Sequence, residues 1–190
     1  AMTDIARAKV LILATDGFEQ SELEVPLKEL RDRGATVHVA APAKTRKQGE
    51  IMGWDEADWG RPVKVDATLD QVDADSYDAL VLPGGVINPD KLRVEEKAIA
   101  IIRRFVADGR IVAAICHGPW LLAEADAVDG RQMTSYASIR TDIENAGASW
   151  VDKEVVTDEG IITSRSPKDL PAFVAKIVEE IGEGRHQRAA

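Results

Sequence analysis

The residues best suited to covalent chemistry in this chain are Cys116 and His117, which are adjacent. Cys116 is the only cysteine in the sequence. The apolar run 111–115 before it has the length and composition of a buried parallel strand. The segment 120–125 after it is typical of a helix, with Pro119 in the first turn. We therefore expect the cysteine at a sharp strand-to-helix turn.

A cysteine at such a turn is expected to be a nucleophile. The string Ala114-Ile115-Cys116-His117-Gly118 resembles the G-x-S-x-G nucleophile elbow, with Cys in place of Ser and Ala in place of the first Gly. Free backbone N–H groups and the positive end of the helix dipole favour the thiolate, so the position predicts a lowered pKa for Cys116. The alternative is a small buried hydrophobe, as most lone cysteines are.

Apolar runs alternate with helical stripes along the whole chain. We expect strands at 8–14, 36–41, 51–52, 62–66, 77–82, 111–115, 133–136, 150–151, 155–157 and 161–164. We expect helices at 19–33, 95–108, 120–125, 139–145 and 166–181. Pro26 should kink or break the first of these helices. The alternation predicts an α/β fold with a doubly wound, mostly parallel sheet and helices on both faces.

Two stretches between these elements are expected to be loops. Residues 86–93 carry no clear helical stripe. Residues 53–60 form an acidic stretch with Trp54 and Trp59. The two rings either mark a contact surface or pack over the edge of the sheet, and both interpretations stay open.

The length of 190 residues predicts one domain. We assign it to residues 8–182, with flexible tails at 1–7 and 183–190. The net charge is -9, from Asp+Glu 33 against Lys+Arg 24, which disfavours nucleic acid and anionic membranes as partners. There is no apolar run of about 20 residues that would span a bilayer and no signal-peptide pattern.

The number and positions of cysteines and histidines indicate the compartment of the protein and whether it binds a metal. One cysteine permits no internal disulfide, which is typical of a cytoplasmic protein. No metal site is expected, because Cys116 and His117 are adjacent, His38 falls in a predicted strand and His186 in the predicted tail.

Residues capable of chemistry gather after three predicted strands, in the loops 15–24, 83–93 and 116–119. Ligands of doubly wound folds bind beyond the carboxyl ends of the strands, at a switch point in strand order. Because all three loops belong to that edge, their convergence is stronger evidence for a site than any single motif.

Three of these motifs carry a family resemblance: Glu19-Gln20-Ser21-Glu22, Pro83-Gly84-Gly85 and Cys116-His117-Gly118-Pro119. The chain resembles the PfpI/ThiJ superfamily, relatives of the class I glutamine amidotransferase fold that include PfpI-type intracellular proteases, glyoxalases and protein deglycases. The similarity extends from Val10 to the last helix. It implies a flavodoxin-like sandwich and association of identical subunits as dimers or hexamers.

The resemblance assigns roles to the catalytic groups. Cys116 matches the nucleophile, and Glu22 matches the glutamate that points at its sulfur, with Glu19 as the competing choice. A carboxyl beside a thiolate should itself be protonated, because two negative charges in a dry pocket repel each other. His117 matches the base, and Asp90 of a neighbouring subunit matches the acid that orients it.

The same resemblance places the remaining site groups. Gly85 and the N–H of His117 would form an oxyanion hole, since a backbone without Cβ approaches a reacting carbonyl closely. Gly84 and Glu19 are expected to contact the substrate.

The implied function is a cofactor-free, stress-related hydrolase or lyase that acts on small 2-oxoaldehydes or on glycated protein, with Glu22 and His117 moving protons. Two alternatives remain. One is an intracellular cysteine peptidase with the same groups, and the other is a non-catalytic redox sensor in which Cys116 is oxidised to sulfinic acid. A site on one small domain fits small carbonyl compounds better than polypeptides.

Overall fold

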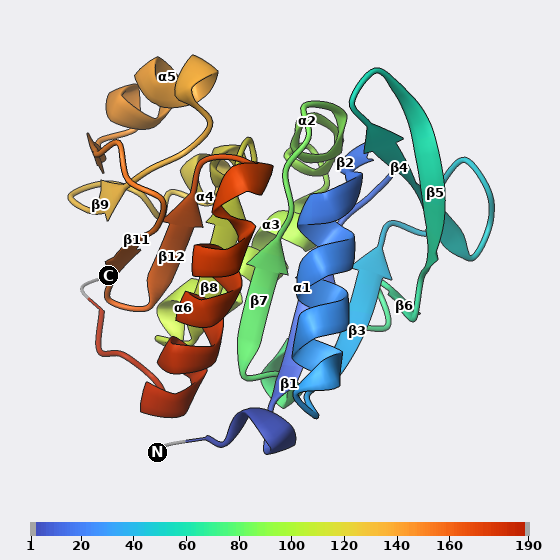
Figure 1. Ribbon diagram of the computed structural model, residues 1–190, viewed down its shortest axis with the longest axis horizontal. Coiled ribbons are helices and arrows are strands. Elements are labelled where there is room, and N and C mark those ends of the chain that lie inside the picture. Colours follow the sequence, from blue (N-terminus) through green and yellow to red (C-terminus); the bar gives the residue numbers. More distant parts are fainter. Residues whose placement is uncertain (1–2, 189–190) are drawn as a thin grey trace.

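A single large sheet organises the chain (Figure 1). The computed structural model describes residues 3–188, and within that range seven strands pair in the order β11-β12-β8-β7-β1-β3-β6. Their bounds are β1 (Lys9–Leu13), β3 (Thr36–Ala41), β6 (Ala67–Thr68), β7 (Ala79–Leu82), β8 (Ile111–Ile115), β11 (Val156–Asp158) and β12 (Ile161–Ser164). All neighbours are parallel except β11, which runs antiparallel to β12. The predicted doubly wound α/β fold is confirmed.

Helices cover both faces of this sheet. The helices are α1 (Gln20–Asp32), α2 (Ile87–Leu92), α3 (Glu96–Ala107), α4 (Pro119–Glu124), α5 (Arg140–Asn145) and α6 (Leu170–Glu183). α1 and α6 pack on one face and α3 and α4 on the other (Figure 1). Short 3₁₀ turns lie at Ile5–Arg7, Ala74–Ser76, Ala137–Ile139 and Pro167–Asp169.

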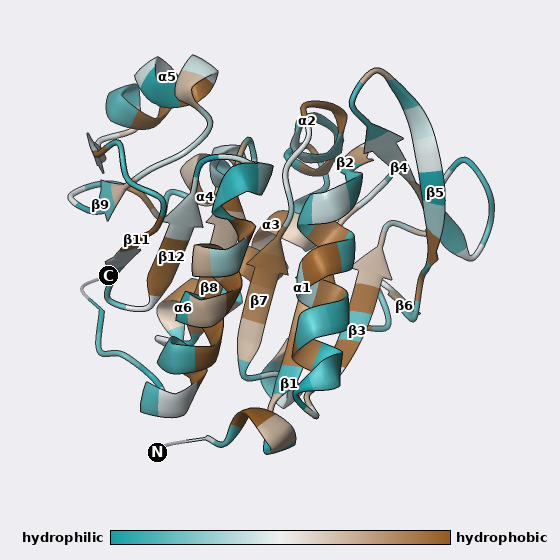
Figure 2. Cartoon of the chain, viewed as in Figure 1, coloured by the Kyte–Doolittle hydropathy of each residue, from teal (hydrophilic) through white to brown (hydrophobic). Residues whose placement is uncertain are grey.

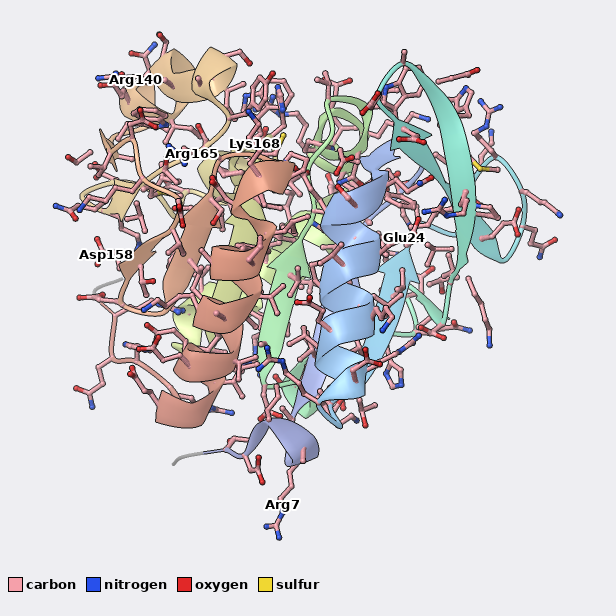
Figure 3. All side chains as sticks on the ribbon, viewed as in Figure 1. Arg7, Glu24, Arg140, Asp158, Arg165 and Lys168 are labelled. Carbon is pink, nitrogen blue, oxygen red and sulfur yellow. The ribbon has the colours of Figure 1, made fainter. Side chains whose placement is uncertain are left out.

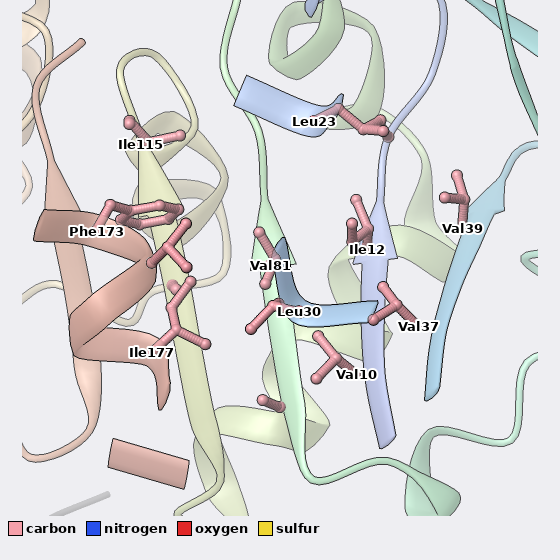
Figure 4. Packing of buried hydrophobic residues seen from close by; sticks show 14 of the residues in the cluster. Val10, Ile12, Leu23, Leu30, Val37, Val39, Val81, Ile115, Phe173 and Ile177 are labelled. Atoms are coloured by element: carbon pink, nitrogen blue, oxygen red, sulfur yellow. The ribbon is translucent and has the colours of Figure 1, made fainter. Parts of the chain in front are cut away.

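The central strands are apolar on both sides because each side is buried under helices. In β1, Val10 and Ile12 face α1 and α6, whereas Leu11 and Leu13 belong to the cluster under α3 and α4. Brown ribbon therefore lines the middle of the molecule in Figure 2, and Figure 4 shows Ile12 among the first cluster. This rigid double-sided core fixes the strand ends that carry the site.

The helix α1 is uninterrupted, although Pro26 stands inside it and was expected to kink or break it. Proline in a helix interior costs about 3 kcal/mol. Pro26 is itself buried, and Leu23 and Leu30 on the same helix pack into the core, so burial of this face keeps the helix intact.

Two predicted loops have regular structure. Residues 87–92 form α2, whose Asn88 and Pro89 are buried. The stretch around the tryptophans is a hairpin of β4 (Glu50–Asp55) and β5 (Asp58–Lys64), joined to β2 (Phe18–Glu19). Trp54 and Trp59 face each other across it edge-to-face at 5.3 Å and are half-buried. The loop expected at residues 53–60 is therefore mostly strand, because cross-strand pairing of the two rings extends the hairpin.

The hairpin is tied to the main body. Arg61 on β5 forms an ion pair of 3.1 Å with Glu24 on α1, which lies beside the hairpin in Figure 3. A further pair of short strands, β9 (Gln132–Met133) and β10 (Ser149–Trp150), lies outside the main sheet. Within residues 3–188, none of the helices combines the length and apolar character required to traverse a bilayer.

The described parts of both chain ends have defined structure, and the flexibility expected for the two tails stays a prediction. Residues 1, 2, 189 and 190 lie outside the described part of the chain. Ile5–Arg7 forms a 3₁₀ turn. At the other end, Arg188 donates hydrogen bonds to the carbonyls of Glu159, Val106 and Arg110, so the segment after α6 lies on the domain.

Candidate active site

Cys116 occupies a strained turn between β8 and α4. Its φ is 65°, in the left-handed region that non-glycine residues rarely adopt. Its N–H donates to the carbonyl of Ser164 at 3.0 Å, and its own carbonyl accepts from the N–H of Tyr136 at 2.9 Å. Such a conformation costs about 1–3 kcal/mol and persists only where its surroundings hold it. The predicted strand-to-helix turn is confirmed, with the backbone geometry of a nucleophile elbow.

Two glycines allow the neighbouring segments to approach the turn at Cys116 closely. A Cβ on Gly84 would lie 2.6 Å from Cys116 Cβ and 2.5 Å from Glu22 Oε1. A Cβ on Gly118 would lie 2.6 Å from the carbonyl oxygen of Leu82. Both contacts are far inside van der Waals distance, so the close approach of β7, α1 and the elbow requires glycine at these two positions.

Glu22 is the carboxyl that the fold brings to the cysteine. It is fully buried at the start of α1. Its Oε1 accepts the Gly84 N–H at 3.0 Å, and the carboxyl interacts with the Cys116 thiol, while its buried Oε2 has no hydrogen-bond partner within residues 3–188. Burial, and secondly the charge of Glu19, raise the pKa of Glu22 well above its usual value of 4.5. Burial therefore favours the protonated form of the carboxyl, and the cause is desolvation rather than the neighbouring thiolate that was expected.

Glu19, the competing choice, serves a different purpose. It is the N-cap of α1, and its Oε2 accepts the N–H of Glu22 at 3.0 Å and the hydroxyl of Ser21 at 2.5 Å. The carboxylate is thus engaged in capping. The N–H of Gly84 is engaged as well, by Glu22. The expected substrate contacts of Glu19 and Gly84 therefore remain a prediction; in the structure the Gly84 N–H and the Glu19 Oε2 already have hydrogen-bond partners.

The thiol of Cys116 departs from the expected lowered pKa. Burial, and secondly the charge of Glu22, raise its pKa, while the backbone N–H groups of Gly85 and His117, which donate to the sulfur, act in the opposite direction. Burial dominates because the thiolate loses its hydration at this depth. These two N–H groups interact with Sγ in the structure, and the oxyanion hole expected from them stays a prediction.

His117 lies within hydrogen-bond distance of the Cys116 thiol. Its Nδ1 lies 3.2 Å from Cys116 Sγ. Burial lowers the pKa of His117 below its usual value of 6.5, so the imidazole is neutral near pH 7 and can accept a proton. Its Nε2 lies 3.4 Å from Ser138 Oγ, which is a weak contact. The site thus holds a thiol, a neutral base and a protonated carboxyl in contact.

Aromatic side chains that the sequence did not assign to the site enclose this histidine. Tyr136 stacks on the imidazole at 4.8 Å and 28°, and Trp120 packs on it edge-to-face at 5.1 Å. Tyr136 is 42% exposed, so it covers the solvent side of His117. The sequence placed Tyr136 in a predicted strand at 133–136, whereas in the structure it follows β9 by three residues and its N–H donates to the Cys116 carbonyl, a long-range contact with no local sequence signal.

Asp90 is not part of this constellation within one chain. It is exposed on the first turn of α2, and the polar partners of His117 in residues 3–188 are Cys116 and Ser138. A contact between Asp90 and His117 therefore requires a second subunit and stays a prediction.

The predicted absence of a metal site concerned His38 and His186. His38 Nδ1 contacts the Tyr77 hydroxyl at 2.7 Å. His186 Nε2 lies 3.1 Å from Glu180 Oε2, and together with Glu183 these side chains could reach one cation. This cluster of Glu180, Glu183 and His186 lies around the end of α6, at the opposite end of the sheet from Cys116 (Figure 1).

A buried thiol at a strained strand-to-helix turn, at the carboxyl edge of a doubly wound sheet, defines a flavodoxin-like α/β protein with an elbow-type candidate active site. The DJ-1/PfpI family model matches residues 8–180, and the chain belongs to this family.

Similar proteins are known from sequence and from structure. The chain is 46% identical over 171 residues to a deglycase of Thermococcus kodakarensis, covering 90% of this chain and 98% of the relative. It is 42% identical over 166 residues to general stress protein 18 of Bacillus subtilis, covering 87% and 92%. The crystal structure of DJ-1beta from Drosophila melanogaster superposes with a TM-score of 0.81 at 32% identity, covering 92% of this chain and 90% of that chain.

Proposed function

We propose that this protein is a cysteine-dependent deglycase that acts on 2-oxoaldehydes or on their adducts with proteins. The observation that supports it best is the contact of the Cys116 thiol with both a neutral His117 and a protonated Glu22. A 46% identical relative named as a deglycase supports the same class of activity.

The geometry suggests how the reaction would proceed. His117 Nδ1 accepts the thiol proton as Sγ attacks the aldehyde carbon, which forms a hemithioacetal. Protonated Glu22 then gives its proton to the oxygen of the neighbouring carbonyl and takes the C–H proton of the hemithioacetal carbon, which forms an enediol. It next gives that proton to the second carbon and takes the proton of the hemithioacetal hydroxyl, so that one carbon is oxidised and the other reduced, giving a 2-hydroxy thioester. Water hydrolyses the thioester to a 2-hydroxy acid and restores the thiol. The sum is 2-oxoaldehyde plus water to 2-hydroxy acid, a balance that requires no external oxidant or reductant.

The thiol with a raised pKa suits this scheme. A buried thiol reacts slowly with adventitious electrophiles, and it becomes a nucleophile only when His117 takes its proton in the site. Low dielectric also strengthens the N–H contacts of Gly85 and His117 with negative charge that develops beside the sulfur.

The test is the formation of lactate from methylglyoxal and from a methylglyoxal-modified protein. Lactate is measured because adducts also decay reversibly to free aldehyde, so that their disappearance alone is ambiguous. Wild-type protein should form lactate, and Cys116→Ala and Glu22→Gln should not do so appreciably. A matched control is Glu29→Gln, which alters an acid on the same helix outside the site.

Absence of lactate together with cleavage of an unmodified polypeptide would replace the proposal with a peptidase. Absence of both, with oxidation of Cys116 by dilute peroxide, would favour a redox sensor. Either result contradicts the deglycase assignment.

We further propose that identical subunits associate so that Asp90 of one orients His117 of another. An unoriented imidazole is a poor base, and no carboxylate reaches His117 within the described part of one chain. Val86, which is 55% exposed, lies beside Gly85 and offers apolar surface for such a contact.

Mixed oligomers test this arrangement. Cys116→Ala and Asp90→Ala chains, each inactive alone, should regain partial activity when dissociated and re-associated together. No recovery in verified mixed oligomers would show that Asp90 does not act across subunits.

A further inference from the structure

A second pocket opens at the carboxyl edge of the sheet, where β1 and β3 end. It has a volume of about 460 Å³, and its walls come from Thr15 and Asp16, from the loop 42–46 and from the end of α2. This volume falls in the range of small-molecule sites, and the edge is the one at which doubly wound folds bind ligands. The reaction described above does not use this pocket.

Three cations line it. Lys44, Arg46 and Lys91 are exposed at its walls, and within residues 3–188 none of them forms an ion pair with a carboxylate. Neighbouring Lys47, by contrast, lies 3.7 Å from Glu50. Glu95 stands at the rim. An unpaired cationic cluster in a chain of net charge -9 is a local feature that favours a compact anion.

The loop 42–46, which carries Lys44 and Arg46, is held in place by Asp16. Asp16 is buried, its Oδ2 accepts the N–H of Arg46 at 2.8 Å and its Oδ1 accepts the N–H of Met52 at 2.8 Å. Both carboxylate oxygens are thus engaged by the backbone. The Arg46 guanidinium lies over the ring of Trp59 at 4.0 Å, which restricts the side chain. A cation that is already ordered loses less entropy when an anion binds.

One buried residue connects this pocket with the active site. Asn88 Oδ1 accepts the N–H of Thr15 at 2.7 Å, and its Nδ2 donates to the carbonyl of Pro83 at 3.0 Å. Thr15 is a wall of the pocket, and Pro83 precedes the Gly84-Gly85 turn that lies against Cys116. The two sites are therefore neighbours along the same edge.

We propose that this pocket is an anion subsite that binds the phosphate group of a small phosphate monoester. Arginine and lysine together match a phosphate dianion, arginine through its planar fork and the lysines as point charges. A long polyanion such as nucleic acid would be repelled by the overall negative charge, whereas a small dianion meets mainly the pocket, where three cations outnumber the two acids Asp16 and Glu95. This binding does not depend on chemistry at Cys116.

The test is a calorimetric titration with glycerol 3-phosphate at constant ionic strength. One saturable site per chain is expected, with Arg46→Gln and Lys44→Gln each weakening binding about tenfold, as loss of one charge-assisted contact does. Lys64→Gln, which removes an exposed lysine from β5, is the matched control and should leave binding unchanged. Lys91→Gln probes the opposite wall should the loop variants misfold.

Repeating the titration with Cys116→Ala protein separates the two sites. Binding should persist there, whatever the outcome of the lactate assay. The proposal is overturned by loss of binding in Cys116→Ala, by no saturation below about 10 mM, or by unchanged affinity in all three pocket variants. Tighter binding of a short single-stranded oligonucleotide that depends on Arg46 would replace the small phosphate with a polymer.

Discussion

Replacement of Glu22 by glutamine separates the catalytic use of this carboxyl from its effect on stability. The side chain is fully buried and its Oε1 accepts one backbone N–H at 3.0 Å. Glutamine has the same shape, can accept the same bond from Gly84, and can turn its amide toward the thiol of Cys116. The substitution therefore leaves the packing intact and removes only the carboxyl proton that Glu22 could transfer.

The sign of the effect on stability follows from the pKa. Burial raises the pKa of Glu22 above 4.5, so between the unfolded and folded pKa values the folded chain holds a proton that the unfolded chain has released. The free energy of unfolding of the wild type then falls as the pH rises through this window, by up to about 1.4 kcal/mol per pH unit. Glu22→Gln has no such titration and should become more stable relative to the wild type with rising pH.

Glu22→Gln is expected to lose activity, although it is expected to gain stability. Loss of a positioned proton donor costs about 10²-fold or more in turnover. Glu22→Gln should therefore combine higher stability at neutral pH with strongly reduced lactate formation. A variant that was simply misfolded would lose both.

Urea unfolding at several pH values between about 5 and 8, at one protein concentration, measures the effect. The difference between Glu22→Gln and the wild type should grow with pH, while Glu29→Gln should run parallel to the wild type. A Glu22→Gln curve parallel to the wild type would falsify the assignment of the raised pKa to this carboxyl, and full activity would remove it from the mechanism.

Three further outcomes are expected. Alkylation of Cys116 by iodoacetamide should still accelerate above pH about 8.5, because burial raises the thiol pKa, and a plateau near pH 7 would contradict this. Gly84→Ala should destabilise the protein by about 1–3 kcal/mol and abolish activity, since its Cβ would overlap Cys116 and Glu22; unchanged melting would show that the elbow has more room. Asn88→Ala should lower the free energy of unfolding by about 1–3 kcal/mol, because it leaves the Thr15 N–H and the Pro83 carbonyl unpaired; urea unfolding measures this, and no change would mean that solvent replaces both partners.

The sequence by itself determined the layered fold and the elbow. Parallel strands buried on both faces read as continuous apolar runs, so 36–41 and 111–115 have the predicted bounds in β3 and β8. The turn at Cys116 was predictable because a strand, a nucleophile, small residues and a helix follow each other within a few positions. Such features are local and leave their signal in the order of residues.

Other features of the site arose only in the tertiary structure. The choice of Glu22 over Glu19, three residues apart at the start of one helix, depends on which carboxyl points under Gly84 and which caps the helix. The raised pKa of Cys116 depends on how deeply the thiol is buried, which the sequence around it does not encode. The hairpin of Trp54 and Trp59 required a partner strand for each ring. Burial and contacts between residues distant in the sequence decide these properties, because they depend on the whole packed chain.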